Sequence, residues 1–448
     1  MTITINMGIP AYFSYIVKNY INVLKSMQTM NREHFHNLYM DCNSIIYDSF
    51  HEIYKTDREN SASFPHILAM VCSKIQAYID EINPSNTIYI AFDGEAPVAK
   101  LRQQAKRRAL KLFLEENGCA EITTGLSTIV ITPGTDFMTY LSKYVVEHRF
   151  KSRKGAKIIV STPEIPGEGE HKIFHYIRDN RDEHRGKTTI VYGLDSDLLM
   201  LSIFHVEYTK LYVFRETPEF IKSIHVDLDP GVGYLLDIEQ LCESINKEIN
   251  MPIGGDSGAT ATTRIHDYAC LCFLLGNDFL PHIPTINIRI DGIQILMEAY
   301  RQTMRVGKLV DIEKREIIWE TFNKVLAWIA VREEEILIRH SKRKNNTNKL
   351  AKREEWYVRI GEVGWCERYA RMIGDEEKYK RGIVWVLKYY TGLEEGKWKG
   401  GKGKLIKGIM EEVMEEEVLE DSERESIWCE MKKWSKEERK GWKKYIWE

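Results

Sequence analysis

The stretch TTIVYGLDSDL, residues 188–198, carries two aspartates, Asp195 and Asp197, directly after a short apolar run. β-Branched and aromatic side chains dominate that run, which is typical of a buried strand. In open α/β sheets, ligands bind at the carboxyl ends of the strands. The stretch therefore predicts a strand that delivers carboxylates to the binding edge of a sheet.

Similar runs precede other polar residues along the chain. LYM ends before Asp41, IYIAF before Asp93 and KIIVS before Thr162. Stretches with helical spacing lie between them, FPHILAMVCSKIQAYIDEI at 64–82 and TDFMTYLSKYVVEHRF at 135–150. This alternation predicts an α/β fold, a parallel sheet with helices on both faces.

Acidic residues occur in this setting throughout the first 280 residues. They are Asp41, Asp93, Glu168, Glu170, Asp195, Asp197 and Asp278. Two like charges about 4 Å apart repel by roughly 4 kcal/mol at an effective dielectric of about 20. A fold that gathers such groups needs cations among them, and oxygen ligands alone favour Mg²⁺ or Mn²⁺. The pattern is typical of a metal-dependent phosphodiesterase.

Four of these acids form two closely spaced pairs. Glu168 and Glu170 lie in the glycine-punctuated PGEGEHK, where an extended backbone would point both the same way. Asp195 and Asp197 are expected to repeat that geometry after their strand. Paired acids of this kind can hold two cations about 4 Å apart, the spacing that serves phosphoryl displacement. Each acid alone is more typical of a turn or helix cap, whereas the set as a whole favours the metal site.

A basic segment, PVAKLRQQAKRRALKLFLEE, begins a few residues after Asp93. It is rich in helix-forming residues, and proline suits a first helical turn. One helical face would carry Lys100, Gln104, Arg107 and Arg108. Most such faces are simply solvated, but one that starts beside a predicted metal ligand can hold a phosphate next to the cations.

Composition indicates an ordinary globular protein with two regions. The chain has 448 residues, 43% hydrophobic and 29% charged, and a formal net charge of −3, so affinity for nucleic acid must come from local basic patches. No apolar run reaches membrane-spanning length, and the N-terminus lacks the pattern of a secretory signal. All Phe lie at or before Phe322 and all Trp from Trp319 onward, which indicates a second, mostly helical region.

Six blocks resemble, in order, those of the 5′→3′ exoribonuclease family of the XRN type. They are MGIPAYFSYI, DCNSII, FDGEAPVAKLRQQAKRR, PGEGEHKIFHYIR, GLDSDLLMLS and GNDFLPHIP. The resemblance implies a Rossmann-like core of the PIN and flap-nuclease kind over 1–300. A helical region over 301–398 is more weakly similar, and the charged tail at 399–448 shows no resemblance. The resemblance also implies that the seven acids are catalytic metal ligands holding two Mg²⁺ or Mn²⁺ ions, and that Lys100, Gln104, Arg107 and Arg108 bind a 5′-monophosphate.

The chain departs from the family pattern at the base-stacking residues. The family stacks a histidine on the first base, and Tyr47 stands at that position. The family's partner tryptophan corresponds to Trp398, which is equally typical of a surface aromatic. No Cys/His knuckle separates GLDSDL from GNDF, which favours the cytoplasmic-type branch or a compact viral relative. The six residues before Met7 are expected to be dispensable.

The resemblance therefore implies a metal-dependent 5′→3′ exoribonuclease that degrades 5′-monophosphorylated single-stranded RNA to nucleoside 5′-monophosphates. A cytoplasmic location is expected, with a nuclear one as the alternative, and no membrane partner. Two other classes of function remain open. One is a structure-specific flap endonuclease, which shares the acidic core; the other is a non-catalytic RNA-binding relative.

Overall fold

The computed structural model describes residues 9, 11–30, 34–56, 64–97, 100, 130–216, 221–250, 260–304, 307–343, 359, 362–373 and 376–392. The chain divides into two compact units. One comprises Met1–Thr2, Pro97–Ser127 and Gly396–Glu448, and the other comprises Ile3–Ala96 and Thr128–Glu395. Every helix and strand named below belongs to the second unit.

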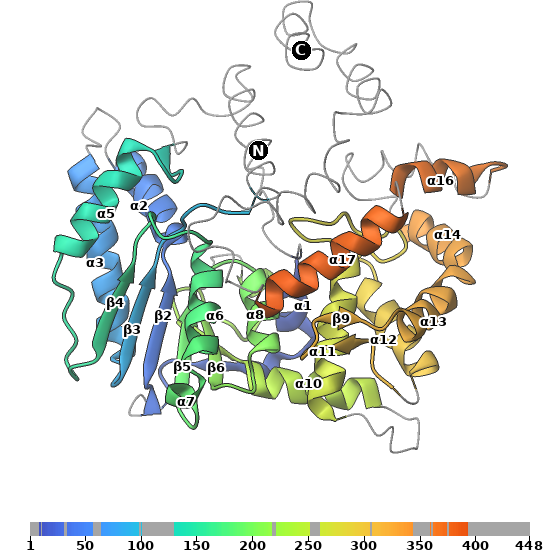
Figure 1. The fold of residues 1–448 in the computed structure, drawn as a ribbon, viewed down its shortest axis with the longest axis horizontal. Helices are drawn as coiled ribbons and strands as arrows, with labels where there is room; N and C mark the ends of the chain where they lie inside the picture. The colour runs from blue at the N-terminus through green and yellow to red at the C-terminus, as the bar shows by residue number, and fades with distance from the viewer. Residues whose placement is uncertain are drawn as a thin grey trace, which may run out of the picture. The chain divides into compact units, whose positions relative to one another are not determined.

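A seven-stranded sheet forms the centre of this unit, in the order β1-β7-β6-β5-β2-β3-β4 (Figure 1). The five strands from β6 to β4 are parallel, whereas β7 runs antiparallel to β6, and β1 antiparallel to β7. Their bounds are β1 Leu24–Ser26, β2 Asn37–Asp41, β3 Thr87–Ala91, β4 Lys157–Ser161, β5 Thr188–Tyr192, β6 Lys210–Arg215 and β7 Tyr234–Asp237. The four strands expected from the sequence are β2, β3, β4 and β5, so the predicted parallel sheet is confirmed.

Helices cover both faces of the sheet, as predicted. Met40 and Tyr192 are neighbours in register on β2 and β5, so they point to one face, and Tyr39 points to the other. The Tyr192 ring contacts Tyr78 of α3 (Phe64–Ile82), with ring centroids 4.5 Å apart. The Tyr39 ring contacts Tyr176 of α6 (Gly169–Asp179) at 5.7 Å. Helices α3 and α6 therefore lie on opposite faces.

The remaining elements are mostly helical, particularly after residue 260. Up to that point they are α1 Tyr12–Asn19, η1 Ile21–Val23, α2 Asn43–Thr56, α5 Asp136–Glu147, α7 Arg181–His184, α8 Asp197–Phe204, α9 Ile221–Ile224 and α10 Ile238–Asn250. After it come α11 Ala261–Cys272, η4 Phe273–Leu275, α12 Gly292–Thr303, β8 Val310–Asp311, β9 Glu316–Ile317, α13 Trp319–Ala330, α14 Glu333–Arg343, α16 Trp365–Ile373 and α17 Glu376–Thr391. The predicted helical C-terminal region is confirmed. Among the described residues, no helix has the length and apolar character needed to cross a membrane.

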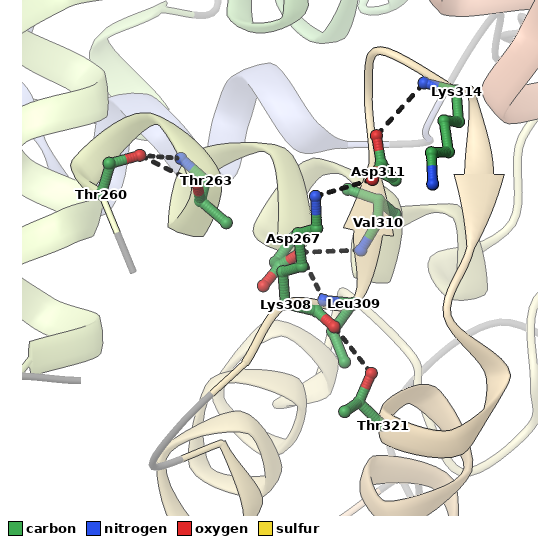
Figure 2. Close-up of polar contacts among 9 residues, drawn as sticks. All are labelled: Thr260, Thr263, Asp267, Lys308, Leu309, Val310, Asp311, Lys314 and Thr321. Atoms are coloured by element: carbon green, nitrogen blue, oxygen red, sulfur yellow. Dashed lines mark hydrogen bonds and ion pairs between the residues drawn. The ribbon is translucent and has the colours of Figure 1, made fainter. Parts of the chain in front are cut away.

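A buried carboxylate links two elements of this helical region to each other. Asp267 of α11 accepts hydrogen bonds from the backbone N–H groups of Leu309 and Val310, at 2.8 and 3.0 Å, where the small β8–β9 hairpin begins (Figure 2). The Tyr300 hydroxyl donates a third at 2.7 Å. These bonds satisfy donors that would otherwise be buried without a partner. Asp267 therefore fixes the hairpin against α11.

Candidate active site

Three of the predicted acids lie at the carboxyl edge of adjacent parallel strands. Asp41 is the last residue of β2, Asp93 follows the end of β3, and Asp195 follows the end of β5. Because β5, β2 and β3 are neighbours with the same direction, their carboxyl ends meet at one edge. The structure brings together the acids that the sequence places after separate strands.

The first group of acids consists of Asp41, Asp93 and Glu170, each with a carboxylate oxygen within 4.8 Å of those of the other two. Asp93 is held from two sides. The Asn43 side-chain amide donates to Oδ2 at 2.6 Å, and the Gly169 N–H donates to Oδ1 at 2.7 Å. The Asp93 N–H in turn donates to Oδ1 of Asn43 at 3.0 Å. Asp93 therefore has a fixed orientation before any cation binds.

The pair Glu168 and Glu170 does not lie in an extended segment, and that prediction is wrong. Glu168 precedes α6 with an extended backbone (φ −71°, ψ 152°), while Glu170 lies in the first turn of the helix. Their oxygens and a ring nitrogen of His171 nonetheless lie within 4.8 Å of one another. A helix N-terminus favours carboxylates, because its N–H groups carry partial positive charge. The helix start, rather than strand geometry, aims both acids at one place.

A second group joins Asp195, Asp197 and Asp278, also with ligand atoms within 4.8 Å of one another. Asp197 begins α8, so the extended geometry expected for this pair is wrong as well. Its backbone N–H donates to Oδ1 of Asp195 at 3.0 Å. Asp278 lies in a turn that the Asn277 side chain closes by accepting from the N–H groups of Phe279 and Leu280, each at 2.9 Å.

The electrostatics of the site are those of crowded, buried carboxylates. Burial first, and then the neighbouring Asp93 and Asp195, raise the pKa of Asp41 well above its usual value. The Asp41 side chain is only 8% exposed, and its Oδ1 has no hydrogen-bond partner in the described part of the chain. A buried anionic oxygen without a donor is expensive to keep. The arrangement therefore favours a cation beside Asp41.

The donors of all three groups, including the one formed by Glu168, Glu170 and His171, fit a hard divalent cation. Apart from His171, the potential ligands are carboxylate oxygens, which suit Mg²⁺ or Mn²⁺ better than soft metals. Asp41 Oδ1 supplies an unpartnered buried acceptor within this set. Two adjacent groups of acids can hold two cations, and the described residues therefore fit the predicted cofactor.

One buried and one partly buried cationic side chain lie near the acids. Lys172 donates to the carbonyls of Phe92 and Thr162 at 2.7 and 3.0 Å, and burial lowers the pKa of its ammonium to about 8. The Arg215 guanidinium, at the end of β6, lies 4.0 Å from the centre of the Phe13 ring. Burial lowers the pKa of Arg215 to about 10, whereas the nearby Asp195 opposes that shift. Arg215 is near enough to offset part of the negative charge at the edge of the sheet.

The other predicted site residues are less fully described. Tyr47 lies on α2 with 39% of its surface exposed, consistent with a ring that can contact a ligand. Lys100 belongs to the first compact unit, whereas the acids belong to the second. Gln104, Arg107, Arg108 and Trp398 lie outside the described residues, as does the segment before Met7.

Sequence reasoning missed three residues that contact the acids. Asn43 pairs with Asp93, and its position two residues after Asp41 in DCNSII is a usable signal. Tyr389 of α17 donates a hydrogen bond to Oε2 of Glu168. Tyr390 lies near Asp197, and burial and that carboxylate raise the pKa of its phenol. No local pattern connects the two tyrosines with acids about 200 residues earlier, so the fold alone reveals them.

Comparison with known proteins agrees with this architecture. The family model described as XRN 5′-3′ exonuclease N-terminus matches residues 7–217, and that described as Xrn1 helical domain matches residues 261–358. The chain is 28% identical over 383 residues to 5′-3′ exoribonuclease 2 of Arabidopsis thaliana, covering 67% of this chain and 37% of the relative. It is 30% identical over 373 residues to 5′-3′ exoribonuclease 1 of Saccharomyces cerevisiae, covering 72% and 24%. The chain thus spans well under half the length of these relatives. A solved structure of the catalytic core of Rad2 with DNA is 12% identical, with a TM-score of 0.39, over 90% of this chain and 94% of that one.

The chain has a mostly parallel sheet covered by helices, and groups of acids gather at the carboxyl ends of its strands. These features place it in the class of α/β proteins with a multi-carboxylate centre. Within that class, the chain belongs to the XRN 5′-3′ exonuclease family.

Proposed function

We propose that this protein is a metal-dependent 5′→3′ exoribonuclease that degrades 5′-monophosphorylated single-stranded RNA to nucleoside 5′-monophosphates. The observation that carries the proposal is the convergence of seven acids in three groups, two of which share Glu170, together with the burial of Asp41 Oδ1, which has no hydrogen-bond partner among the described residues. The names of the curated relatives, 5′-3′ exoribonuclease 1 and 2, support the class of reaction.

Some of the described residues would bind the cations, and others would orient the residues that bind them. Asp41, Asp93 and Glu170 would hold one cation, and Asp195, Asp197 and Asp278 the other. Bound Mg²⁺ or Mn²⁺ activates water and neutralises charge on the phosphate. Asn43 and Gly169 orient the Asp93 carboxylate so that little reorganisation accompanies the reaction.

Residues predicted from the sequence would recognise the 5′ end of the RNA. Lys100, Gln104, Arg107 and Arg108 would bind the 5′-phosphate, since Arg and Lys make strong charge-assisted bonds to phosphate oxygens. Tyr47, partly exposed on α2, would stack on the first base, with Trp398 as its partner. Stacking is tolerant of base identity, so sequence preference should be weak.

The decisive experiment compares three RNAs with the purified 448-residue chain and Mg²⁺. A 3′-labelled single strand with a 5′-monophosphate should yield mononucleotides, the same strand with a 5′-hydroxyl should be degraded far more slowly, and a circular RNA should stay intact. The Asp197→Asn variant serves as the inactive control. Cleavage of the circle would indicate an endonuclease, whereas binding without any cleavage would indicate a non-catalytic relative.

A further inference from the structure

Helix α17 brings an aromatic cluster to the acids from far along the chain. The Tyr389 ring lies on His171, with ring centroids 3.8 Å apart, and stacks on Trp385 at 4.9 Å with an interplanar angle of 12°. Phe279, next to Asp278 in sequence, contacts the same ring at 5.3 Å. Tyr389 is thus wedged among residues that flank both groups of acids, and only 7% of its surface is exposed.

The hydroxyl of this buried ring has a specific partner. It donates to Oε2 of Glu168, which is itself 3% exposed. A carboxylate has about four acceptor positions, so Glu168 can accept the phenol and still offer an oxygen to a cation. Glu168 lies at the helix N-terminus, just before α6, and no side-chain cap bond fixes it there. The phenol therefore holds one oxygen of Glu168 in a defined direction.

We infer that Tyr389 is a positioning residue, whose hydroxyl holds Glu168 in the orientation that binds a divalent cation. The inference rests on the metal centre of the proposed function. Groups that hydrogen-bond to metal ligands typically affect metal affinity by 10- to 100-fold when removed. A residue that only packs would leave that affinity unchanged.

The test measures cation binding directly, without RNA. Tyr389→Phe keeps the ring and its stacking and removes only the hydroxyl. Titration calorimetry of Mn²⁺ into the full chain should show a dissociation constant at least about 10-fold higher for this variant. Its melting temperature in EDTA should fall by no more than about 2 °C, the scale expected for one hydrogen bond in a chain of this size.

Tyr379→Phe is the matched control. Tyr379 lies on the same helix, and its hydroxyl donates to the Pro281 carbonyl at 3.0 Å, so the variant also loses one hydroxyl hydrogen bond. Its Mn²⁺ affinity should equal that of the wild type. Glu168→Gln completes a double-mutant cycle, in which adding Tyr389→Phe to Glu168→Gln should weaken Mn²⁺ binding no further.

Three results would overturn the inference. Equal Mn²⁺ affinities for Tyr389→Phe and wild type would show that Tyr389 only packs, and tighter binding would show that its hydroxyl competes with the cation. Additive losses in the cycle would show that Tyr389 does not act through Glu168. Failure of the proposed function looks different: a wild-type chain that binds Mn²⁺ yet degrades no RNA refutes the exoribonuclease and leaves the role of Tyr389 standing.

Discussion

The backbone N–H of Gly169 donates a 2.7 Å hydrogen bond to Oδ1 of Asp93 and so joins the first turn of α6 to the end of β3. This close approach requires glycine. A Cβ atom at residue 169 would lie 2.4 Å from Oδ1 of Asp41 and 3.4 Å from Oδ1 of Asp93. The site therefore depends on a residue without a side chain as much as on its carboxylates.

Gly169→Ala should inactivate the protein through this crowding. The methyl group would push the short Asp41 side chain aside, at a cost of about 1–3 kcal/mol typical of overpacking. RNA cleavage in Mg²⁺ is expected to fall at least about 100-fold, because Asp41 loses its ligand position. The control is Gly134→Ala, at a positive φ of 90° with no atom within 4 Å of the added Cβ, which costs stability without touching the acids. Equal losses of activity in both variants would contradict the explanation.

Asp41→Asn should raise the stability of the metal-free protein while lowering its RNA-cleaving activity. Burial and neighbouring carboxylates raise the pKa of Asp41, so its ionised form destabilises the metal-free protein at neutral pH. The variant should melt at a higher temperature than wild type in EDTA and lose cleavage in Mg²⁺ by at least about 100-fold. Asp237→Asn is the control, since Asp237 is also 8% exposed but accepts from the Gln240 N–H at 3.1 Å, a cap that asparagine can keep. A lower melting temperature for Asp41→Asn in EDTA would refute the repulsion argument.

Asp267 should make stability depend on pH. Burial raises the pKa of this carboxyl from 3.8 to about 6, despite three hydrogen bonds that lower it. A raised pKa in the folded state means that protonation stabilises the fold. That stability is fully present below about pH 4 and is lost as the pH rises through 6, by up to about 3 kcal/mol.

Asp267→Asn should remove this dependence. The asparagine carbonyl can still accept from the Leu309 and Val310 N–H groups. The free energy of unfolding at pH 7.5, measured with urea in EDTA, should therefore be at least as high as that of wild type. The difference should shrink toward pH 4. Asp267→Ala leaves three donors unpaired and should destabilise by about 3 kcal/mol or more at every pH. The free energy of unfolding of Asp267→Asn is compared with that of wild type at each pH. If this difference favours the variant less at pH 7.5 than at pH 5, the raised pKa of Asp267 is contradicted.

Arg107→Ala tests recognition of the RNA end. Loss of a charge-assisted contact of roughly 1.5–3 kcal/mol should lower kcat/KM on 5′-monophosphate RNA by about 10- to 100-fold. The slow rate on 5′-hydroxyl RNA should barely change, because that substrate offers no phosphate. Lys106→Ala, off the predicted face, is the control. Equal losses on both RNA ends would show that Arg107 supports the fold or general backbone binding.

The strand ends of this fold could be predicted from the sequence because buried parallel strands are short apolar runs, and Asp41, Asp93 and Asp195 directly follow them. The geometry of Glu170 and Asp197 could not, since two residues of spacing fit an extended segment and a helix start equally well. The antiparallel strands β1 and β7 were also missed; with three and four residues, they are too short to show periodicity. The contact of Tyr389 with Glu168 could not be predicted either, because it depends on where α17 packs in the folded chain.

The pairing of β1 with β7 bears on how the protein is made. Leu24 is synthesised 212 residues before its sheet partner, Leu236. At about 5–20 residues per second, β1 must wait on the order of tens of seconds of synthesis for that partner. Such long-range pairing also slows folding in general. Because α17 emerges later still, a nascent chain would carry all seven acids before it has the phenol that contacts Glu168. The complete centre therefore forms only after residue 389 has been synthesised.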